Sequence, residues 1–116
     1  MTLLSIDAKV GHDVVTLRTV EGRTFELFHS QDCCETVEVQ DIVGDLNDLL
    51  GSPLLVALEV TSEKHPHGFV EPQWGMDSFT WTFYKLATVK GWVDIRWLGE
   101  SNGYYSESVE MHEVTQ

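Results

Sequence analysis

The sequence predicts an α+β protein: mainly an antiparallel β-sheet or small open barrel of about six to seven strands, with one short helix. Three observations support this class. Alternating and β-branched segments recur along the chain, tight-turn signals separate several of them, and one short stretch has the pattern of a helix followed by a stop signal. At 116 residues the chain can bury one core, so we expect a single domain over residues 1–116.

The first two strands are expected to form a hairpin. Residues 13–20 and residues 23–30 both alternate between apolar and polar side chains, and only Glu21 and Gly22 separate them. A two-residue connection with a glycine that can adopt positive φ is typical of a β-hairpin. These two segments should therefore pair with each other.

The middle of the chain contains the only expected helix. Residues 36–42 read as a short strand, and residues 45–50 as one or two helical turns, which Gly51 and Pro53 end. Residues 54–62 are almost continuously apolar, and such a run is typical of a central strand that is buried on both faces.

The C-terminal half is predicted to contain three more strands, at residues 78–88, 92–98 and 104–114. Before them, residues 63–77 hold two prolines and two glycines and form a loop of 15 residues. Loops of this length without structure of their own are uncommon in compact domains and often serve a function.

The chain has four tryptophans, and most of them are expected in the core because they follow the alternation of the strands. Trp74 differs, since it follows a proline in the long loop, where packing does not obviously require it. A tryptophan in a loop can stack on a flat ligand. It can equally anchor the loop or fill a contact between subunits.

The charge excludes some partners. The net charge is −12, from nineteen acidic and seven basic residues, and it repels nucleic acids and anionic membranes. We therefore expect no direct binding to nucleic acid and no membrane association. The acidity is compatible with a solvated surface, with a nucleic-acid mimic that blocks a DNA-handling enzyme, or with a pocket in which a few cationic or aromatic groups are local exceptions.

The N-terminus and the cysteines indicate a cytoplasmic protein. The N-terminal residues lack the basic region of a signal peptide, and no apolar run approaches the length of a membrane span. The two cysteines, Cys33 and Cys34, are adjacent, and a bridge between them closes a strained eight-membered ring. We therefore expect no ordinary intrachain disulfide, which fits a reducing compartment.

Few side chains in the sequence have the spacing that a metal site or a catalytic site requires. His29, Cys33 and Cys34 lie close in sequence, and His65 and His67 are further zinc-type ligands. Adjacent cysteines point apart on a strand, however, and no glycine-rich oxyanion loop or phosphate-binding loop accompanies them. We therefore expect neither a metal nor another cofactor, and no enzymatic activity.

Arg96 is the cation with the most suggestive surroundings. It stands between two tryptophans, on the same strand face as Trp92 and Asp94. It either stacks on an indole and reaches an anionic ligand, or pairs with Asp94 or a cross-strand acid as a surface arginine does.

Two separated segments resemble a known family. These are H-S-Q-D-C-C-E at 29–35 and E-S-N-G-Y-Y-S-E-S at 100–108, joined by D-I-V-G-D-L-N-D-L-L-G-S-P at 41–53. The chain, from about residue 23 to residue 112, resembles a domain of unknown function found in bacteriophages and some bacteria. More distantly, it is similar to the Thoeris anti-defence sponge proteins of phages.

The resemblance implies a function without catalysis. Sponge proteins are oligomers that sequester a cyclic ADP-ribose-type immune signal, and some hold cyclic oligonucleotides. We therefore expect a non-enzymatic phage-type homo-oligomer in the host cytoplasm that binds a small cyclic nucleotide; an acidic protein–protein inhibitor or nucleic-acid mimic is the alternative. The expected ligand contacts are Trp74, Arg96, Asn102, Tyr104 and Tyr105.

The turn signal in the second segment leads to a structural expectation. Asn102 and Gly103 should turn the chain so that Tyr104 and Tyr105 fall on opposite faces of the last strand. One ring would then cover the core beneath the segment 33–34, and the other would serve a pocket or a subunit contact. The two distant segments are thus expected to meet in space.

Overall fold

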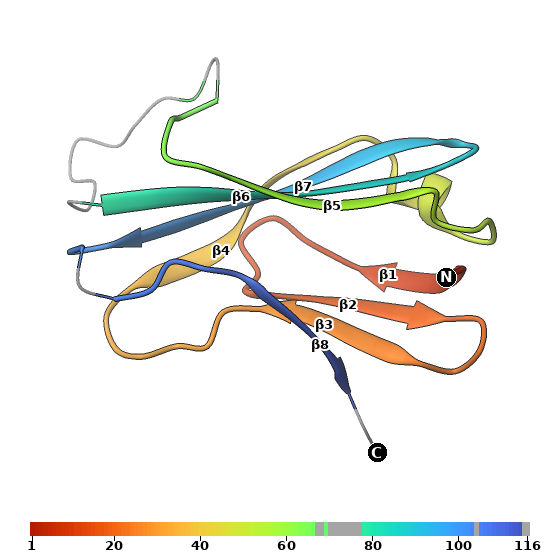
Figure 1. Ribbon diagram of the computed structural model, residues 1–116, viewed down its shortest axis with the longest axis horizontal. Coiled ribbons are helices and arrows are strands. Elements are labelled where there is room, and N and C mark those ends of the chain that lie inside the picture. Colours follow the sequence, from red (N-terminus) through yellow and green to blue (C-terminus); the bar gives the residue numbers. More distant parts are fainter. Residues whose placement is uncertain (67–68, 70–77, 104, 115–116) are drawn as a thin grey trace.

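The computed structural model folds the chain into two antiparallel four-stranded sheets that pack face to face (Figure 1). It describes residues 1–66, 69, 78–103 and 105–114. In this described part, no helix has the length and apolar character needed to cross a membrane.

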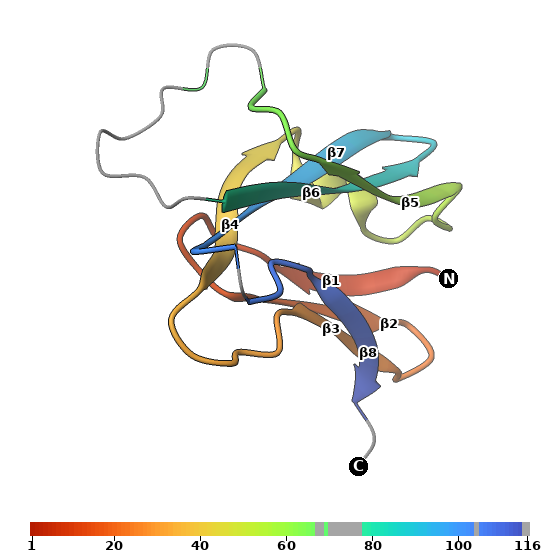
Figure 2. The same ribbon diagram turned by 60° about the vertical axis from the view of Figure 1, so that its left-hand side comes forward.

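Each sheet combines strands from different parts of the chain. The strands of the first sheet are β1 (Leu3–Asp7), β2 (Val14–Thr19), β3 (Thr24–Phe28) and β8 (Glu110–Val114), in that spatial order. The strands of the second sheet are β4 (Thr36–Val43), β5 (Val56–Ser62), β6 (Ser78–Thr88) and β7 (Gly91–Ser101), in the order β4-β7-β6-β5. Figure 2 shows the two sheets from a second side.

The antiparallel, strand-rich part of the prediction is confirmed, but the α+β label and the number of strands are not. The described residues contain eight strands, and their only helical element is the 3₁₀ turn η1 (Leu46–Leu49). The side chain of Asp45 caps this turn by accepting a hydrogen bond from Asn47 N. Gly44 precedes it and Gly51 follows it, both at positive φ, so the segment has room for a single turn.

The expected hairpin is present, whereas the first strand was not predicted. Strands β2 and β3 pair as expected, but the predicted two-residue loop is wrong: Arg18 lies opposite Thr24 and Thr19 N donates to Arg23 O, so the loop has three residues, 20–22. Strand β1 pairs with β2, but its register shifts between Leu3 and Ser5. This shift interrupts the alternation of apolar and polar side chains in a short segment. The sequence pattern alone therefore does not reveal strand β1.

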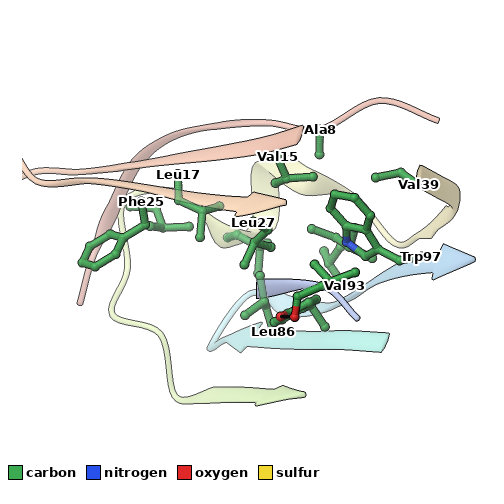
Figure 3. Close-up of a cluster of buried hydrophobic side chains, with 14 of the residues drawn as sticks. Ala8, Val15, Leu17, Phe25, Leu27, Val39, Leu86, Val93 and Trp97 are labelled. Carbon is green, nitrogen blue, oxygen red and sulfur yellow. Dashed lines mark hydrogen bonds between the residues drawn. The ribbon is translucent and has the colours of Figure 1, made fainter. Parts of the chain in front are cut away.

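The core lies between the inner faces of the sheets. Figure 3 shows side chains from both sheets meeting in this space. The predicted common face of Val93, Ile95 and Trp97 is confirmed, since all three are buried there. The other core side chains labelled in the figure are Ala8, Val15, Leu17, Phe25, Leu27, Val39 and Leu86.

The outer face of the second sheet carries an aromatic cluster. Phe79, Trp81 and Phe83 share this face, as predicted from their alternation. His65 lies against Phe79 with ring centroids 3.8 Å apart, and its Nδ1 accepts a hydrogen bond from Trp81 Nε1. Trp81 is therefore buried although it lies outside the sandwich, whereas Trp92 is 61% exposed and is not a core residue.

The two long flanks of the sandwich differ. On one flank backbone hydrogen bonds join the sheets: Gly11 N donates to Val39 O, and Val39 N donates to His12 O. On the other flank lie the edge strands β5 and β8, which do not pair with each other in the described structure. We call this side, between β5 and β8, the open flank.

Candidate functional site

The H-S-Q-D-C-C-E segment folds around a buried carboxylate, that of Glu35. The segment connects β3 to β4, and the Glu35 side chain is fully buried. The carboxylate lies 2.8 Å from His29 Nε2 and accepts hydrogen bonds from the backbone N–H groups of Asp32 and Cys33 and from Gln31 Nε2. The motif therefore forms a loop in which four hydrogen-bonding groups converge on one carboxylate.

These contacts keep Glu35 ionised. Burial acts to raise the pKa of the Glu35 carboxyl, but the hydrogen bonds from Cys33 N–H and His29 outweigh it and lower the pKa to about 2. On its far side His29 Nδ1 lies 2.7 Å from Ser108 O, which can only accept, so Nδ1 is a donor. His29 therefore bridges the Glu35 carboxylate and Ser108 O and ties the two segments together.

The two motif segments meet in space as expected, through polar contacts. His29 reaches Ser108, and Ser30 Oγ donates to Glu110 at 3.3 Å. That one of the two tyrosine rings covers the core beneath the 33–34 segment stays a prediction, because Tyr104 lies outside the described residues.

The expectation of unpaired cysteines is wrong in this structure. Cys33 and Cys34 form a disulfide between adjacent residues, and both are exposed. The loop is held by the Glu35 carboxylate on one side, so the two cysteines do not take the alternating directions of a strand. No group of three metal-ligand side chains occurs among the described residues.

The E-S-N-G-Y-Y-S-E-S segment is organised by a second buried glutamate. The Glu107 carboxylate accepts hydrogen bonds from Thr80 Oγ1 at 2.7 Å and from Ser101 Oγ at 2.5 Å. The turn begins where Gly103, at φ +89°, donates its N–H to Ser101 Oγ. The backbone then returns over β7 so closely that a Cβ on Gly99 would lie 2.7 Å from Glu107 O.

This path changes the prediction for the tyrosines. The last strand begins at Glu110 and not at residue 104, so Tyr105 lies in an irregular segment before β8. The alternation of side chains along a strand therefore does not decide where Tyr105 points. Tyr105 is half-buried and precedes the Glu107 anchor by two residues.

The candidate site is a pocket of about 340 Å³ on the open flank, which we call the hydroxyl pocket. Strand β5 contributes Glu59 and Thr61, and β6 contributes its hydroxyl residues from Ser78 to Thr82. The opposite wall is residues 105–109 of the second motif. Seven of its ten lining side chains carry a hydroxyl group and two carry a carboxylate, while none of these described residues is basic.

Thr82 gives this pocket an unsatisfied polar group. Thr82 is 1% exposed, and among the described residues no group hydrogen-bonds to its Oγ1. Buried hydroxyl groups are nearly always paired, so a partner from outside the described residues is expected. Nearby, Tyr84 OH donates to Glu59 Oε2 at 2.6 Å, and burial together with this contact raises the pKa of Tyr84.

Arg96 lies on the other face of the sheet from the hydroxyl pocket. Its guanidinium stacks on Phe83, 5.6 Å from the ring centroid, and lies 3.9 Å from Asp41 and 3.8 Å from Asp94. The structure therefore has the arginine paired with surface acids, and the aromatic partner is Phe83 instead of an indole. Phe83 on β6 is paired with Arg96 on β7, so the two side chains lie on the same face of the sheet and point away from the core.

The structure brings together only part of the predicted site. Tyr105 lines the hydroxyl pocket, whereas Asn102 is exposed in the turn and does not line it. Trp74 and Tyr104 lie outside the described residues.

The residues that the prediction missed have a signal in the sequence. Ser78, Thr80 and Thr82 alternate with Phe79, Trp81 and Phe83. The aromatic face looks like the core face, but the hydroxyl face is the one that points between the sheets. The sequence of β6 reads S-F-T-W-T-F-Y, and its alternation shows that one face carries only hydroxyl groups before Tyr84.

The fold and the site define a small two-sheet β-sandwich with a hydroxyl-lined, acidic pocket at its open flank. The chain belongs to the DUF7448 family, a domain of unknown function, which it matches over residues 2–111. Searches of curated proteins and of solved structures give no match to this chain.

Proposed function

We propose that this protein is a non-enzymatic binding protein that holds a small ligand by its sugar hydroxyl groups in the hydroxyl pocket. The observation that carries the proposal is the unpaired, buried hydroxyl of Thr82 in a pocket lined mainly by hydroxyl groups. Sugar hydroxyl groups both donate and accept hydrogen bonds, so they suit a lining of hydroxyls and carboxylates.

The charge of the pocket selects the part of the ligand that enters. Glu59 and Glu107 repel a phosphate but accept hydrogen bonds from a vicinal diol. The cyclic ADP-ribose-type ligand expected from the resemblance would therefore insert a ribose and leave its phosphates toward solvent. Tyr105 supplies an aromatic surface at the same wall.

The surroundings favour binding over turnover. Both oxygens of Glu107 already accept hydrogen bonds from Thr80 and Ser101, and Glu35 is enclosed in its own loop. Neither carboxylate is poised as a general base. In this proposal the protein acts as a sponge, by stoichiometric sequestration of a cyclic nucleotide-type signal.

Calorimetric titration tests the proposal. The probes are adenosine, cyclic ADP-ribose, a cyclic dinucleotide and methyl β-glucoside, with inorganic pyrophosphate as the anion control. We expect at least one sugar-bearing probe to bind and pyrophosphate not to bind, and the bound probe to be recovered unchanged after the protein is denatured. Binding by none of the sugar-bearing probes contradicts the proposal, and so does a recovered reaction product.

A matched pair of variants locates the binding. Thr82→Val keeps the shape of the side chain but removes the unpaired hydroxyl, so it should weaken binding about 2- to 10-fold, the value of one neutral hydrogen bond. Thr16→Val on β2 removes a hydroxyl away from the pocket and should leave the affinity unchanged. Equal affinities of the two variants would place the ligand elsewhere.

A further inference from the structure

A second pocket opens on the same flank of the sandwich. Its volume is about 220 Å³, and its walls are mainly aliphatic side chains; we call it the apolar pocket. Leu17, Leu27 and Leu86 form its floor and belong to the buried core. Ala57 on β5 and Met111 on β8 form its rim, and Met111 is 52% exposed.

The two pockets adjoin each other. Glu59 lines both of them. Tyr84 lines the apolar pocket, and its hydroxyl group lies 2.6 Å from Glu59 Oε2 and 3.2 Å from the carbonyl oxygen of Val109, which lines the hydroxyl pocket. The hydrogen-bonded pair of Tyr84 and Glu59 is thus the boundary between a polar chamber and an apolar chamber of one cleft.

From this continuity we infer that the ligand is amphipathic: a hydroxylated head occupies the hydroxyl pocket, and an apolar arm crosses the Tyr84–Glu59 pair into the apolar pocket. The inference rests on the proposed function and adds the second half of the ligand. An aliphatic arm would cover the exposed rim and the leucine floor, and burial of apolar surface is favourable in proportion to the area that leaves water.

Charge argues for a neutral arm in the apolar pocket and against a second copy of this chain in the cleft. Each copy carries a net charge of −12, and Glu110 adjoins Met111 in β8, whereas the charge of Glu113 is paired with Arg23. Glu59 lies on the β5 side of the cleft. Bringing two such surfaces together places like charges opposite each other, whereas a neutral arm adds no charge.

The test compares ligands that differ only in their arm. One series is methyl, hexyl and octyl β-glucoside, kept below the micelle concentration; the other is adenosine and N6-hexyladenosine. A fully buried methylene group tightens binding by about fourfold, so partial burial of the arm should give at least a tenfold lower Kd for the alkyl member than for its parent in one series. If neither series shows this gain, the inference is overturned.

The two series also separate the inference from the proposed function. If the parent compounds bind and the alkyl arms add nothing, the hydroxyl pocket stands and the apolar arm is refuted. If alkyl members bind with the full gain, both claims are supported. If no member of either series binds, both claims fail together.

Two variants assign the gain to the apolar pocket. Met111→Glu places a charge at its rim and should abolish the gain from the alkyl arm while leaving the affinity for the parent compound unchanged. Val89→Glu makes the same charge change at a residue that is 78% exposed in the turn between β6 and β7, and should retain the gain. An undiminished gain in Met111→Glu overturns the inference. So does a dimer, seen by light scattering, that Met111→Glu dissociates, because the cleft would then hold a second copy.

Discussion

The close approach of residues 105–109 to β7 makes Gly99 the most informative position to change. A Cβ at this position would lie 2.7 Å from the carbonyl oxygen, 2.8 Å from the Cβ and 3.2 Å from the Cα of Glu107. The first two distances are shorter than real contacts of a Cβ, and two of these three atoms are backbone, which no rotamer change can move. In Gly99→Ala the Glu107 segment must therefore shift until its oxygen is at an ordinary contact distance of 3.4 Å or more.

The expected cost follows from overpacking in a buried contact. Such insertions cost about 1–3 kcal/mol, and replacing glycine by alanine in a strand returns about 0.5–1 kcal/mol, so we expect a net loss of about 0–2.5 kcal/mol, centred at about 1 kcal/mol. In urea, with a slope of about 1–3 kcal/mol per molar, a loss of about 1 kcal/mol should lower the unfolding midpoint by roughly 0.3–1 M. Tryptophan fluorescence follows the transition, since Trp81 and Trp97 are buried.

Gly91→Ala is the matched control at the other end of β7. There the nearest atom to a new Cβ is Asp48 Oδ2 at 2.8 Å, the end of a side chain that can rotate away. This variant should be as stable as the wild type or slightly more stable. If Gly99→Ala is as stable as Gly91→Ala, the segment does not pack on β7 as described, and the account of the hydroxyl pocket wall is refuted.

Three further changes test other parts of the account. Glu35→Gln should be less stable than the wild type at pH 7. The difference in stability should shrink as the pH falls from about 4.5 toward 2, because the pKa of Glu35 in the folded state, about 2, lies below its ordinary value of 4.5. Urea unfolding midpoints measured across this pH range would test this. Trp92→Phe should reduce the fraction of fluorescence that acrylamide quenches, whereas Trp97→Phe should not, since Trp92 is exposed and Trp97 is buried. Arg96→Met should change the affinity for sugar-bearing ligands less than twofold in calorimetry, because Arg96 points away from the pocket; a tenfold loss would contradict this placement.

Strand periodicity predicts the strands of this fold well, whereas the sequence predicts its helical segment and its fold class poorly. The segments 13–20, 23–30, 78–88 and 92–98 form strands because each alternates with a period of two over most of its length. The segment 45–50 has helical caps but too few residues between its glycines for an α-helix. The pairing of distant strands into two sheets depends on contacts that alternation does not encode.

The candidate site is less visible in the sequence because it depends on tertiary contacts. Nothing near Glu35 or Glu107 in the chain indicates that their carboxylates are buried; each becomes the centre of a loop only after the strands assemble. The sequence is equally ambiguous about which face of β6 points between the sheets. Phe79 and Trp81 would suit a core, and His65 covers them from outside instead.

The most direct test of the central claim is an NMR titration of the ¹⁵N-labelled protein with adenosine and with octyl β-glucoside. The account predicts chemical-shift changes that concentrate on the amides of Thr80, Thr82 and residues 105–109, extending to Met111 only for the ligand with the apolar arm. Shift changes that concentrate around Phe83 and Arg96 on the outer face, or no changes with either compound, would contradict it.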